Sequence, residues 1–374
     1  MKGNMNTIID LRHELHRYPE LSMKEYETKN RLIRFLEGYT SAEIHDQDSW
    51  FYCIIGKEKP GKAIAFRAEM DALPMTESTD LPYASVYFGA AHKCGHDGHM
   101  AALCGLAMEL EKHPAERPVY LIFQPGEEIG AGGKMCAEFV KQEGIAEIYA
   151  CHNLEGYPEN SIVIRDGLTQ PASEGLSLLF EGMRSHASEP ETGRNPSEVI
   201  ARTALFAVER AGKPHQGMVL CTIVGMKAGT GDFGISAGDG SLSLTLRSEN
   251  EEEMLELEKE IRTFAEEQAE KTGLRFSYSI QDFFPETRNT QEGLCKVRKA
   301  AEKLGLAVIE MDHLWKASED FGWYTKDTEG AIFYIGTGEK HAALHTDDYD
   351  FNDNVTGTIV GMMKELIYAE KNAV

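Results

Sequence analysis

The sequence of 374 residues predicts an α/β fold, in which one domain has a mostly parallel central sheet flanked by helices and a second, inserted domain is ferredoxin-like (βαββαβ). Three observations support this fold class. Short apolar runs alternate with segments of helical periodicity in the first half of the chain and return near its end. The stretch between these parts carries strands of strict apolar–polar alternation. The chain also exceeds the roughly 250–300 residues at which a single core stops growing.

The first part of the chain predicts two helical segments and three strands. Residues 7–38 read as a helix that is interrupted near Tyr18-Pro19 and then resumes, because proline cannot continue a helix. Residues 98–112 have apolar side chains at helical spacing. The run VYLIFQ at 119–124 is apolar apart from its last residue and bounded by prolines, which is typical of a strand buried on both faces. The other two strands are KAIAFRA at 62–68 and EIYACH at 147–152.

The pattern changes near residue 174. Four strands are expected at 175–182, 218–225, 241–247 and 274–280, and two helices at 196–210 and 251–271. Their order is β-α-β-β-α-β, the split βαβ arrangement. The strand at 331–336 and a terminal helix at 355–370 return to the α/β style. We therefore expect one domain formed by residues 1–173 and 285–374, interrupted by a domain at 174–284.

Composition excludes several classes of protein. The chain has 38 Lys and Arg against 61 Asp and Glu, a net charge of −23, which argues against binding to nucleic acid or to an anionic membrane. No apolar stretch approaches the ~18 residues of a transmembrane helix, and the N-terminus shows no export signal. Seven scattered cysteines then indicate reduced thiols in a cytoplasmic protein. Six of them are expected to be small buried apolar residues, with Cys94 as the exception.

The segment HKCGHDGHM at 92–100 is the first sign of chemistry. Cys94 and His96 lie two residues apart, and thiolate and imidazole both suit Zn²⁺ and related ions. Further ligand-type residues follow predicted strands: Glu127-Glu128 after 119–124, His152 at the end of 147–152, and His345 after 331–336. In open α/β sheets, ligands bind at the carboxyl ends of strands.

Each of these residues alone has an ordinary interpretation. A Glu-Glu pair is usually a solvated surface, His152 could be a hydrogen-bonded core histidine, and His345 could be a loop residue. Their shared position at strand ends, together with Cys94 and His96, favours a metal site over coincidence. His99 is expected to hydrogen-bond near the site rather than to ligate a metal.

At these positions the sequence resembles the family of aminoacylases, hippurate hydrolases and auxin-conjugate hydrolases, which are metal-dependent amidohydrolases related to metallopeptidases. The resemblance covers nearly the whole chain and matches in order and spacing. The matching motifs are LRHELHRYPELS (11–22), FRAEMDALPMTE (66–77), HKCGHDGHM (92–100), FQPGEEIGAGG (123–133), HNLEG (152–156), SHASEPETGRNP (185–196), SEDFGWY (318–324) and LHTDDYDFND (344–353).

The resemblance implies a catalytic domain that binds two divalent metal ions and an inserted lid domain that often mediates dimers. Carried over position by position, the metal ligands are Cys94, His96, Glu128, His152 and His345. Glu127 falls at the general base, Asp71 at an aspartate that orients a ligating histidine, and His186 at a lid histidine that approaches the substrate. The ligand set mixes soft and hard donors and leaves Zn²⁺, Mn²⁺, Co²⁺ and Ni²⁺ open.

The chain departs from the family pattern at three places. Glu69 replaces the usual aspartate, Ile129 follows the acidic pair where glycine is common, and Met183-Arg184-Ser185 alters the lid motif before His186. None of these changes removes an implied ligand or the base. The lid changes bear on substrate preference, because that loop faces the substrate in the family. Arg247 could hold a substrate carboxylate or be an ordinary surface charge.

The leading functional hypothesis is hydrolysis of the amide bond of an N-acyl amino acid by a metal-activated water, with Glu127 as general base. One alternative is a dipeptidase or aminopeptidase of the same mechanism, for which we identify no acidic group to bind the substrate amine. Another is a non-catalytic metal-binding relative, although such a protein would not need a free base. The expected partners are a small-molecule substrate and a second copy of the chain. Acetyl, benzoyl, indole-acetyl and succinyl groups all remain possible for the acyl part.

Overall fold

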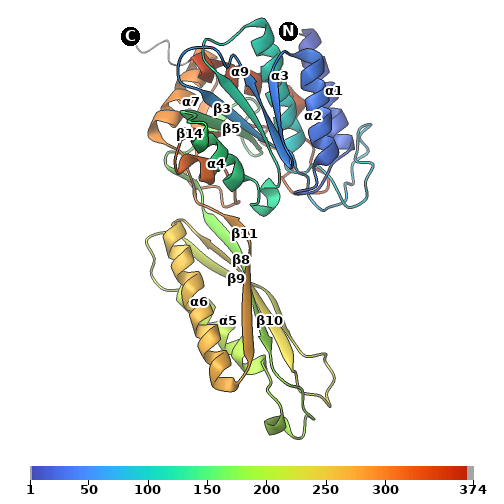
Figure 1. The fold of residues 1–374 in the computed structure, drawn as a ribbon, viewed down its shortest axis with the longest axis vertical. Coiled ribbons are helices and arrows are strands. Elements are labelled where there is room, and N and C mark those ends of the chain that lie inside the picture. Colours follow the sequence, from blue (N-terminus) through green and yellow to red (C-terminus); the bar gives the residue numbers. More distant parts are fainter. Residues whose placement is uncertain (1, 369–374) are drawn as a thin grey trace. The chain divides into compact units, whose positions relative to one another are not determined.

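The computed structural model describes residues 2–368 and divides into two compact units (Figure 1). The first unit comprises the residues up to Thr169, Thr287–Leu314, and those from Glu319 onward. The second comprises Gln170–Glu286 and Trp315–Ser318. The last two residues of the expected helix 355–370 lie outside the described residues.

The first unit is built on an eight-stranded sheet of order β1-β2-β4-β3-β5-β14-β6-β13. Its central strands β4, β3, β5 and β14 are all parallel, whereas β1, β2 and β6 add antiparallel pairings nearer the edges. The predicted mostly parallel sheet is therefore confirmed. The strands of this sheet are β1 (Glu43–Gln47), β2 (Trp50–Ile55), β3 (Ile64–Glu69), β4 (Val119–Gln124), β5 (Glu147–Leu154), β6 (Ile162–Ile164), β13 (Val308–Glu310) and β14 (Glu329–Gly336). A separate two-stranded sheet pairs β7 (Leu168–Gln170) with β12 (Thr287–Arg288).

Helix α3 (His96–Lys112) occupies a central position in this unit. Most of its residues are buried, and it packs against β3 and against helices α1 (Lys2–Arg17), α2 (Tyr26–Tyr39) and α9 (Thr356–Tyr368). Pro19 lies between α1 and α2, which confirms the expected interruption. The remaining helices of the unit are α4 (Gly133–Gln142), α7 (Gln291–Lys303), α8 (Gly322–Thr325) and the 3₁₀ turns η1 (Glu127–Ile129) and η3 (Asp353–Val355).

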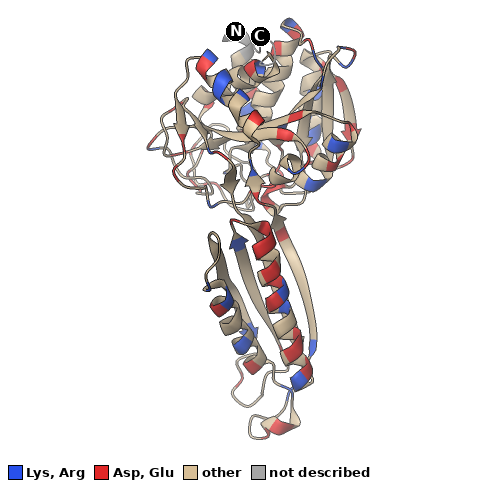
Figure 2. Cartoon of the chain, turned by 90° about the vertical axis from the view of Figure 1, so that its left-hand side faces the viewer, with Lys and Arg blue, Asp and Glu red and all other residues tan. Residues whose placement is uncertain are grey.

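The second unit contains one four-stranded antiparallel sheet of order β11-β8-β10-β9 and two long helices. Along the chain its elements are β8 (Ala172–Glu181), η2 (Pro190–Thr192), α5 (Ser197–Ala211), β9 (Val219–Ala228), β10 (Asp239–Ser248), α6 (Glu251–Thr272) and β11 (Arg275–Phe284). Leu242, Leu244 and Leu246 of β10 pack with Met254, Leu257 and Ile261 of α6 in one buried core. Acidic residues recur along α6 (Figure 2), and Glu252, Glu256, Glu266, Glu267 and Glu270 are exposed.

The seven cysteines are all free in the structure. Cys94 and four others are buried, but Cys221 is only partly buried and Cys295 is exposed. The expectation that every cysteine other than Cys94 is a buried apolar residue was therefore wrong for these two. The cytoplasmic location stays a prediction.

No described helix combines the length and the apolar character that a membrane-spanning segment requires.

Glu174 is an unusual member of the second unit's core. It lies on β8 opposite Leu246, is almost fully buried, and neither carboxylate oxygen has a hydrogen-bond partner among the described residues. Burial and the nearby Glu258, which accepts a hydrogen bond from Arg262, raise the pKa of Glu174 from its ordinary value of 4.5 to about 7. The folded state therefore favours the neutral carboxyl group.

We predict that Glu174→Gln stabilises the second unit at high pH. In the wild type, the stability associated with this carboxyl is fully present below pH 4.5, falls between pH 4.5 and 7, and stays low above pH 7. The variant has no charge to bury, so we expect it to gain about 1–2 kcal/mol over the wild type at pH 8 and nothing at pH 4. Chemical unfolding at several pH values measures this difference. Glu270→Gln, on the exposed side of α6, is the matched control and should show no such trend.

Candidate metal centre

The parallel strands bring the predicted ligand residues to one edge of the first unit's sheet. Glu127 and Glu128 follow β4 through the turn Pro125-Gly126, and His152 lies close to the end of β5. His345 lies in the loop after β14, and His96 is the first residue of α3. These segments are far apart in sequence, and they meet because neighbouring parallel strands end on the same side of a sheet.

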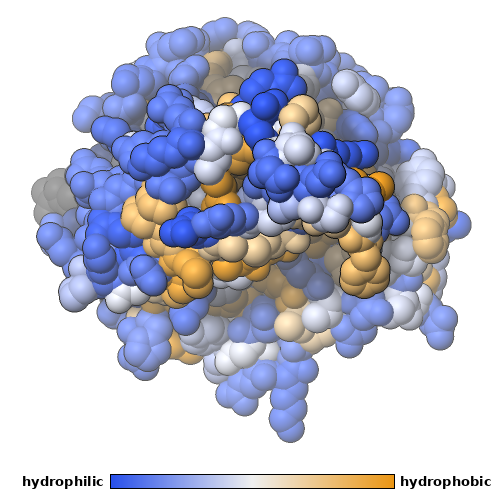
Figure 3. Space-filling view, turned by 90° about the horizontal axis from the view of Figure 1, so that it is seen from below, coloured by the Kyte–Doolittle hydropathy of each residue, from blue (hydrophilic) through white to orange (hydrophobic). Residues whose placement is uncertain are grey.

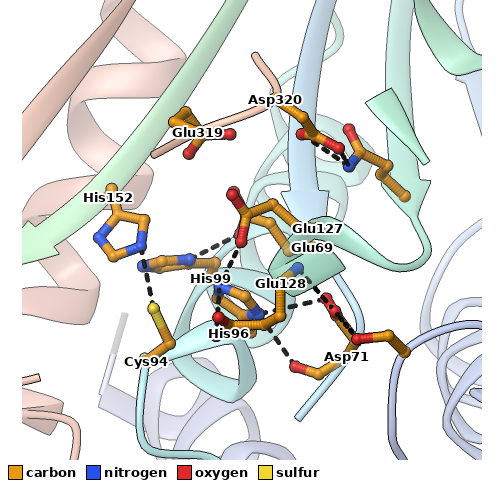
Figure 4. A network of polar contacts seen from close by, with 12 residues as sticks. Glu69, Asp71, Cys94, His96, His99, Glu127, Glu128, His152, Glu319 and Asp320 are labelled. Atoms are coloured by element: carbon orange, nitrogen blue, oxygen red, sulfur yellow. Dashed lines mark hydrogen bonds and ion pairs between the residues drawn. The ribbon is translucent and has the colours of Figure 1, made fainter. Parts of the chain in front are cut away.

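Four of the five predicted ligands, Cys94, His96, Glu128 and His152, lie close together in Figure 4. Ligand atoms of Cys94, Glu128 and His345 also lie within 4.8 Å of one another, as do those of Cys94, His96 and His152. Cys94 Sγ lies 3.5 Å from His152 Nε2 and 3.3 Å from His345 Nε2. Glu128 is the link to the other side of the cluster, because its Oε2 lies 3.6 Å from His345 Nε2 and its Oε1 lies 3.9 Å from His96 Nε2. The structure thus brings Cys94, His96, Glu128, His152 and His345 into one cluster.

Two of the histidines are oriented by main-chain carbonyl groups. His96 Nδ1 lies 2.9 Å from the carbonyl oxygen of Asp71, and His152 Nδ1 lies 2.8 Å from that of Asn153. A proton on Nδ1 that is donated to a carbonyl leaves Nε2 unprotonated in the neutral ring. Both rings therefore present the nitrogen that can bind a metal, and both turn it toward the cluster.

These residues fit divalent metal ions. His96 Nε2 and Glu128 Oε1 are buried and have no hydrogen-bond partner among the described residues, which is costly unless another group satisfies them. Burial, followed by the nearby carboxylates of Glu128 and Glu127, raises the pKa of the Cys94 thiol well above its ordinary value. A cation would offset this crowding of negative donors, and the thiolate, imidazole and carboxylate donors suit zinc and neighbouring transition metals.

Asp71 lies beside His96, and the orienting role that the resemblance implies for it stays a prediction. Its Oδ1 lies 3.4 Å from His96 Nδ1, and its Oδ2 accepts hydrogen bonds from Ser22 Oγ at 2.7 Å and from the Glu128 main-chain N–H at 2.9 Å. Although burial opposes ionisation, the hydrogen bond with His96 lowers the pKa of Asp71 below its ordinary value. One buried carboxylate thus contacts the segments that carry two of the ligands.

Glu127 lies beside the cluster rather than within it. Its Oε2 is 3.7 Å from His96 Nε2, and its side chain is nearly buried. Burial, with repulsion from Glu319 and then Glu128, raises the pKa of Glu127 well above its ordinary value. Such a carboxyl group holds a proton more readily than an exposed one, which suits a group that must accept and release protons.

Gly95 allows the ligands on either side of it to approach the neighbouring strand. Its φ of +96° lies in the left-handed region that favours glycine. A side chain at this position would overlap Asn153 Oδ1 and lie 2.9 Å from the Tyr349 hydroxyl oxygen. The glycine between Cys94 and His96 is therefore required by packing as well as by backbone conformation.

A buried network of charges next to this cluster was missed by the sequence analysis. Arg67, inside β3, contacts the carboxylates of Glu69, Glu319 and Asp320 and donates from Nε to Gln124 at 2.9 Å. Although burial opposes ionisation, Arg67 and then His99 keep the pKa of Glu69 well below its ordinary value. The available signal was a charged residue, Arg67, in the middle of an otherwise apolar strand.

His99 belongs to this network, as expected from the sequence. Its Nδ1 lies 2.7 Å from Glu69 Oε2, and its Nε2 lies 2.7 Å from Asn153 Oδ1. Both ring nitrogens are thus engaged by protein groups, so His99 hydrogen-bonds beside the ligands and leaves no nitrogen for a metal.

The remaining two predicted site residues lie in the second unit. His186 is exposed, its Nδ1 is 2.6 Å from Ser188 Oγ, and it pairs with Ile235 in an isolated β-bridge. Arg247, on β10, is partly buried and donates from Nη2 to Ser318 Oγ at 3.0 Å, while its Nε has no hydrogen-bond partner among the described residues. Their roles stay predictions.

Comparisons with known proteins agree with this reading of the cluster. The model of "Peptidase family M20/M25/M40" matches residues 65–369. An N-acetylcysteine deacetylase from Bacillus subtilis is 29% identical over 337 residues, covering 88% of each chain. Thermostable carboxypeptidase 1 from Saccharolobus solfataricus is 30% identical over 350 residues, covering 90% of this chain and 88% of that protein. The crystal structure of the Bacillus subtilis YXEP protein, described as a dinuclear metal-binding peptidase of the M20 family, superposes with a TM-score of 0.82 at 25% identity, covering 100% and 99% of the two chains.

Proposed function

The chain belongs to peptidase family M20/M25/M40, and we propose that it is a metal-dependent amidohydrolase that removes the acyl group from N-acyl amino acids. The observation that carries the proposal is one cluster at the carboxyl edge of the sheet. There a thiol, three imidazoles and a carboxylate converge, and a buried glutamate, Glu127, lies beside them. The ligand set fits two metal ions, and Zn²⁺, Mn²⁺, Co²⁺ and Ni²⁺ are the candidates.

Cys94, His96, Glu128, His152 and His345 would hold the ions. Bound divalent ions lower the pKa of water and polarise a carbonyl oxygen, which is the chemistry that amide hydrolysis lacks in neutral solution. Glu127 would accept the proton of the attacking water and deliver it to the leaving nitrogen. Asp71 would keep His96 and the Glu128 segment in place through the hydrogen bonds that it makes with them.

The adjacent glutamates would have different tasks because their surroundings differ. Glu128 Oε1 and Oε2 each lie near a ligand histidine, His96 and His345. Glu127 faces Glu319 and Asp320 as well as His96, so its negative charge is disfavoured by burial and by these neighbours. Burial also raises the pKa of Glu128, to about 7, so the two glutamates differ in position rather than in the direction of their pKa shifts. A carboxylate committed to a metal ion cannot shuttle protons, whereas Glu127, beside the cluster, would stay free to do so.

Arg247 is our candidate for the substrate carboxylate. It makes no ion pair with any described residue, and burial lowers the pKa of its guanidinium below the ordinary value. Its partner Ser318 directly precedes Glu319 in the chain. A partly buried guanidinium without a counter-ion is suited to a bidentate contact with a carboxylate. The deacetylase relative is described as acting on an N-acetylated amino acid, a substrate class that carries such a group.

We further propose that residues 174–284, which form most of the second unit, are an inserted ferredoxin-like lid that also forms a homodimer. Its order of elements and sheet, β11-β8-β10-β9, supports the ferredoxin-like description. Strand β9 lies at the edge of this sheet and exposes Leu220, Ile223, Val224 and Met226, and α5 exposes Leu205 and Val208. Figure 3 shows apolar side chains exposed on one face of the molecule. His186 would approach the substrate from this lid.

We predict that Glu127→Gln abolishes hydrolysis while metal binding is retained. Glutamine has the same shape but cannot accept the proton, so we expect kcat to fall by about 10²–10⁴-fold. Release of amino acids is measured from a panel of N-acyl amino acids and dipeptides, with enzyme reloaded separately with each of the four metals. Metal content is measured in parallel, and Glu138→Gln, on the exposed surface of α4, is the control and should be fully active.

Three results of this panel separate the possible functions. Metal-dependent release from one acyl class, lost in Glu127→Gln, supports the deacylase. Release from dipeptides alone favours the peptidase, an activity consistent with the carboxypeptidase relative. If Glu127→Gln were as active as the wild type, the assignment of the base would be wrong.

We predict that Arg247→Met raises KM for N-acyl amino acids by about 10–100-fold, because a hydrogen bond to a charged group contributes about 1.5–3 kcal/mol. The same substrates with the carboxylate converted to an amide should show no such change. Steady-state kinetics on both substrate forms give this comparison. Arg202→Met, on the exposed surface of α5, is the control. An equal loss on acid and amide substrates would contradict the assigned role.

We predict that Val224→Lys weakens self-association. Edge strands present unpaired main-chain groups, and exposed apolar side chains beside them mark a surface for pairing. A lysine at the centre of β9 would oppose its own copy in a symmetric dimer. Sedimentation over a range of protein concentrations measures the effect, with Tyr26→Lys on α2 of the first unit as the control. A wild-type chain that is monomeric at all concentrations would refute the dimer.

A further inference from the structure

His345 is presented differently from the other ligand residues. It lies in the loop between β14 and η3, and its φ of +62° is in the left-handed region, which non-glycine residues rarely adopt. Its side chain is 52% exposed, whereas those of His96 and His152 are buried. The position of His345 therefore depends on what holds this loop.

Lys93 holds the loop at two points. Its main-chain carbonyl accepts a hydrogen bond from the His345 N–H at 2.8 Å. Its side-chain ammonium donates to the carbonyl oxygen of Tyr349 at 2.6 Å. One residue thus contacts both ends of the five-residue segment that starts with His345. Lys93 also directly precedes Cys94, whose sulfur lies 3.3 Å from His345 Nε2.

The Lys93 side chain is fully buried, so its charge must be compensated. Glu77 Oε1 accepts a hydrogen bond from its ammonium at 2.7 Å. Glu77 is itself held by His16 Nε2 at 3.1 Å and by the Ser85 main-chain N–H at 2.7 Å. The ammonium therefore joins the loop at Tyr349 to the segment that carries Glu77. The next residue of that segment, Ser78, also contacts the loop, because its main-chain N–H donates to the Asp347 carbonyl oxygen at 3.1 Å.

We propose that Lys93 is a positioning residue that sets the separation of Cys94 and His345. It does so through its two hydrogen bonds to the segment 345–349, one at each end. The proposal rests on the metal centre of the proposed function. Lys93 would not contact a metal ion itself. It would nevertheless raise the affinity for the ion that His345 would bind. Changes in groups that orient ligands typically cost 10–100-fold in metal affinity.

The test uses Co²⁺ as the probe, because its visible absorption reports both its geometry and a bond to a thiolate. Metal-free full-length protein is titrated with Co²⁺, and affinities are confirmed by competition with Zn²⁺. We expect the wild type to bind two equivalents of Co²⁺, one more weakly than the other. Lys93→Met should bind the weaker equivalent 10–100-fold less tightly than the wild type does. Titration of His345→Ala shows which of the two equivalents loses affinity when the His345 ligand is removed. If Lys93 acts through His345, the double variant binds no more weakly than His345→Ala alone.

The chain offers a matched control in Lys29. Its side chain is also nearly buried, and its ammonium likewise contacts one carboxylate, that of Asp46, and one main-chain carbonyl, that of Asp48. Lys29→Met should lower the thermal midpoint to a similar degree and leave Co²⁺ binding unchanged. An equal loss of Co²⁺ affinity in Lys29→Met would show a general effect of destabilisation and overturn the proposal.

Two further outcomes are decisive. If the wild type binds two ions and Lys93→Met binds them with wild-type affinity, the positioning role is refuted and the proposed function stands. If the wild type binds no Co²⁺, the metal centre itself is wrong, and the inference falls with it. Should Lys93→Met not fold, Lys93→Arg keeps the positive charge beside Glu77 but cannot reproduce the geometry at Tyr349. Lys93→Arg should show the same loss of affinity for the weaker Co²⁺ equivalent. Wild-type affinity in this variant would refute the role of the two hydrogen bonds to the loop.

Discussion

The candidate metal centre depends on the parallel pairing of β4, β3, β5 and β14. Four strands that run in the same direction end at the same edge, so whatever follows each of them is placed beside its neighbours. The strands themselves are almost entirely buried. Their main-chain hydrogen bonds to one another set the register in which they pair. Glu127, Glu128, His152 and His345 lie at or beyond the ends of these strands, and the parallel pairing brings them to one edge.

The same arrangement brings several buried carboxylates close together beside the site, where their negative charges repel one another. Several carboxylates converge on a volume from which water is excluded, and burial disfavours the charge of each. Arg67 offsets this for Glu69, Glu319 and Asp320 through direct hydrogen bonds. Glu127 makes no such contact with Arg67 and is left with a raised pKa. Of the carboxylates that Arg67 contacts, Glu69 has a pKa held well below its ordinary value, whereas burial raises the pKa of Asp320 to about 7. The network therefore separates Glu69, which is held ionised, from buried carboxyl groups such as Glu127 that hold a proton more readily.

Local sequence patterns predicted the elements that bury a continuous apolar surface. These elements are the strands β3, β4, β5 and β14 and the helix α3. Their apolar residues follow the spacing of a buried strand or helix, so few other structures fit these segments. The strands β1 and β2 and the helices α4 and α7 were not expected. Residues 274–280 alternate in sequence, and β11 forms at Arg275–Phe284. This edge strand leaves both faces largely exposed, so alternation predicted the strand and not its burial.

For the site, spacing and position after strands favoured a metal site, and the resemblance to a known family supplied the set of candidate ligands. The groups that orient them were harder to find, because their partners are distant in the chain. Arg67 and Glu319 are 252 residues apart, and Lys93 and Tyr349 are 256 residues apart. No periodicity or motif records such a contact. The contacts of Lys93 with the loop also involve main-chain groups, which any residue type supplies and which therefore leave no trace in the sequence.

The candidate ligands differ in how firmly the fold holds them, and this difference has a consequence for the two ions of the proposed function. His96 begins a buried helix, His152 lies near the end of a buried strand, and each ring is hydrogen-bonded to a main-chain carbonyl. His345 is half exposed on a loop and adopts a left-handed backbone conformation. An ion held mainly by the first two meets preformed ligands, whereas an ion that needs His345 must also bear the cost of ordering the loop. Lys93 reduces that cost before any ion binds, because the loop is already tied at both ends of the segment that carries the ligand.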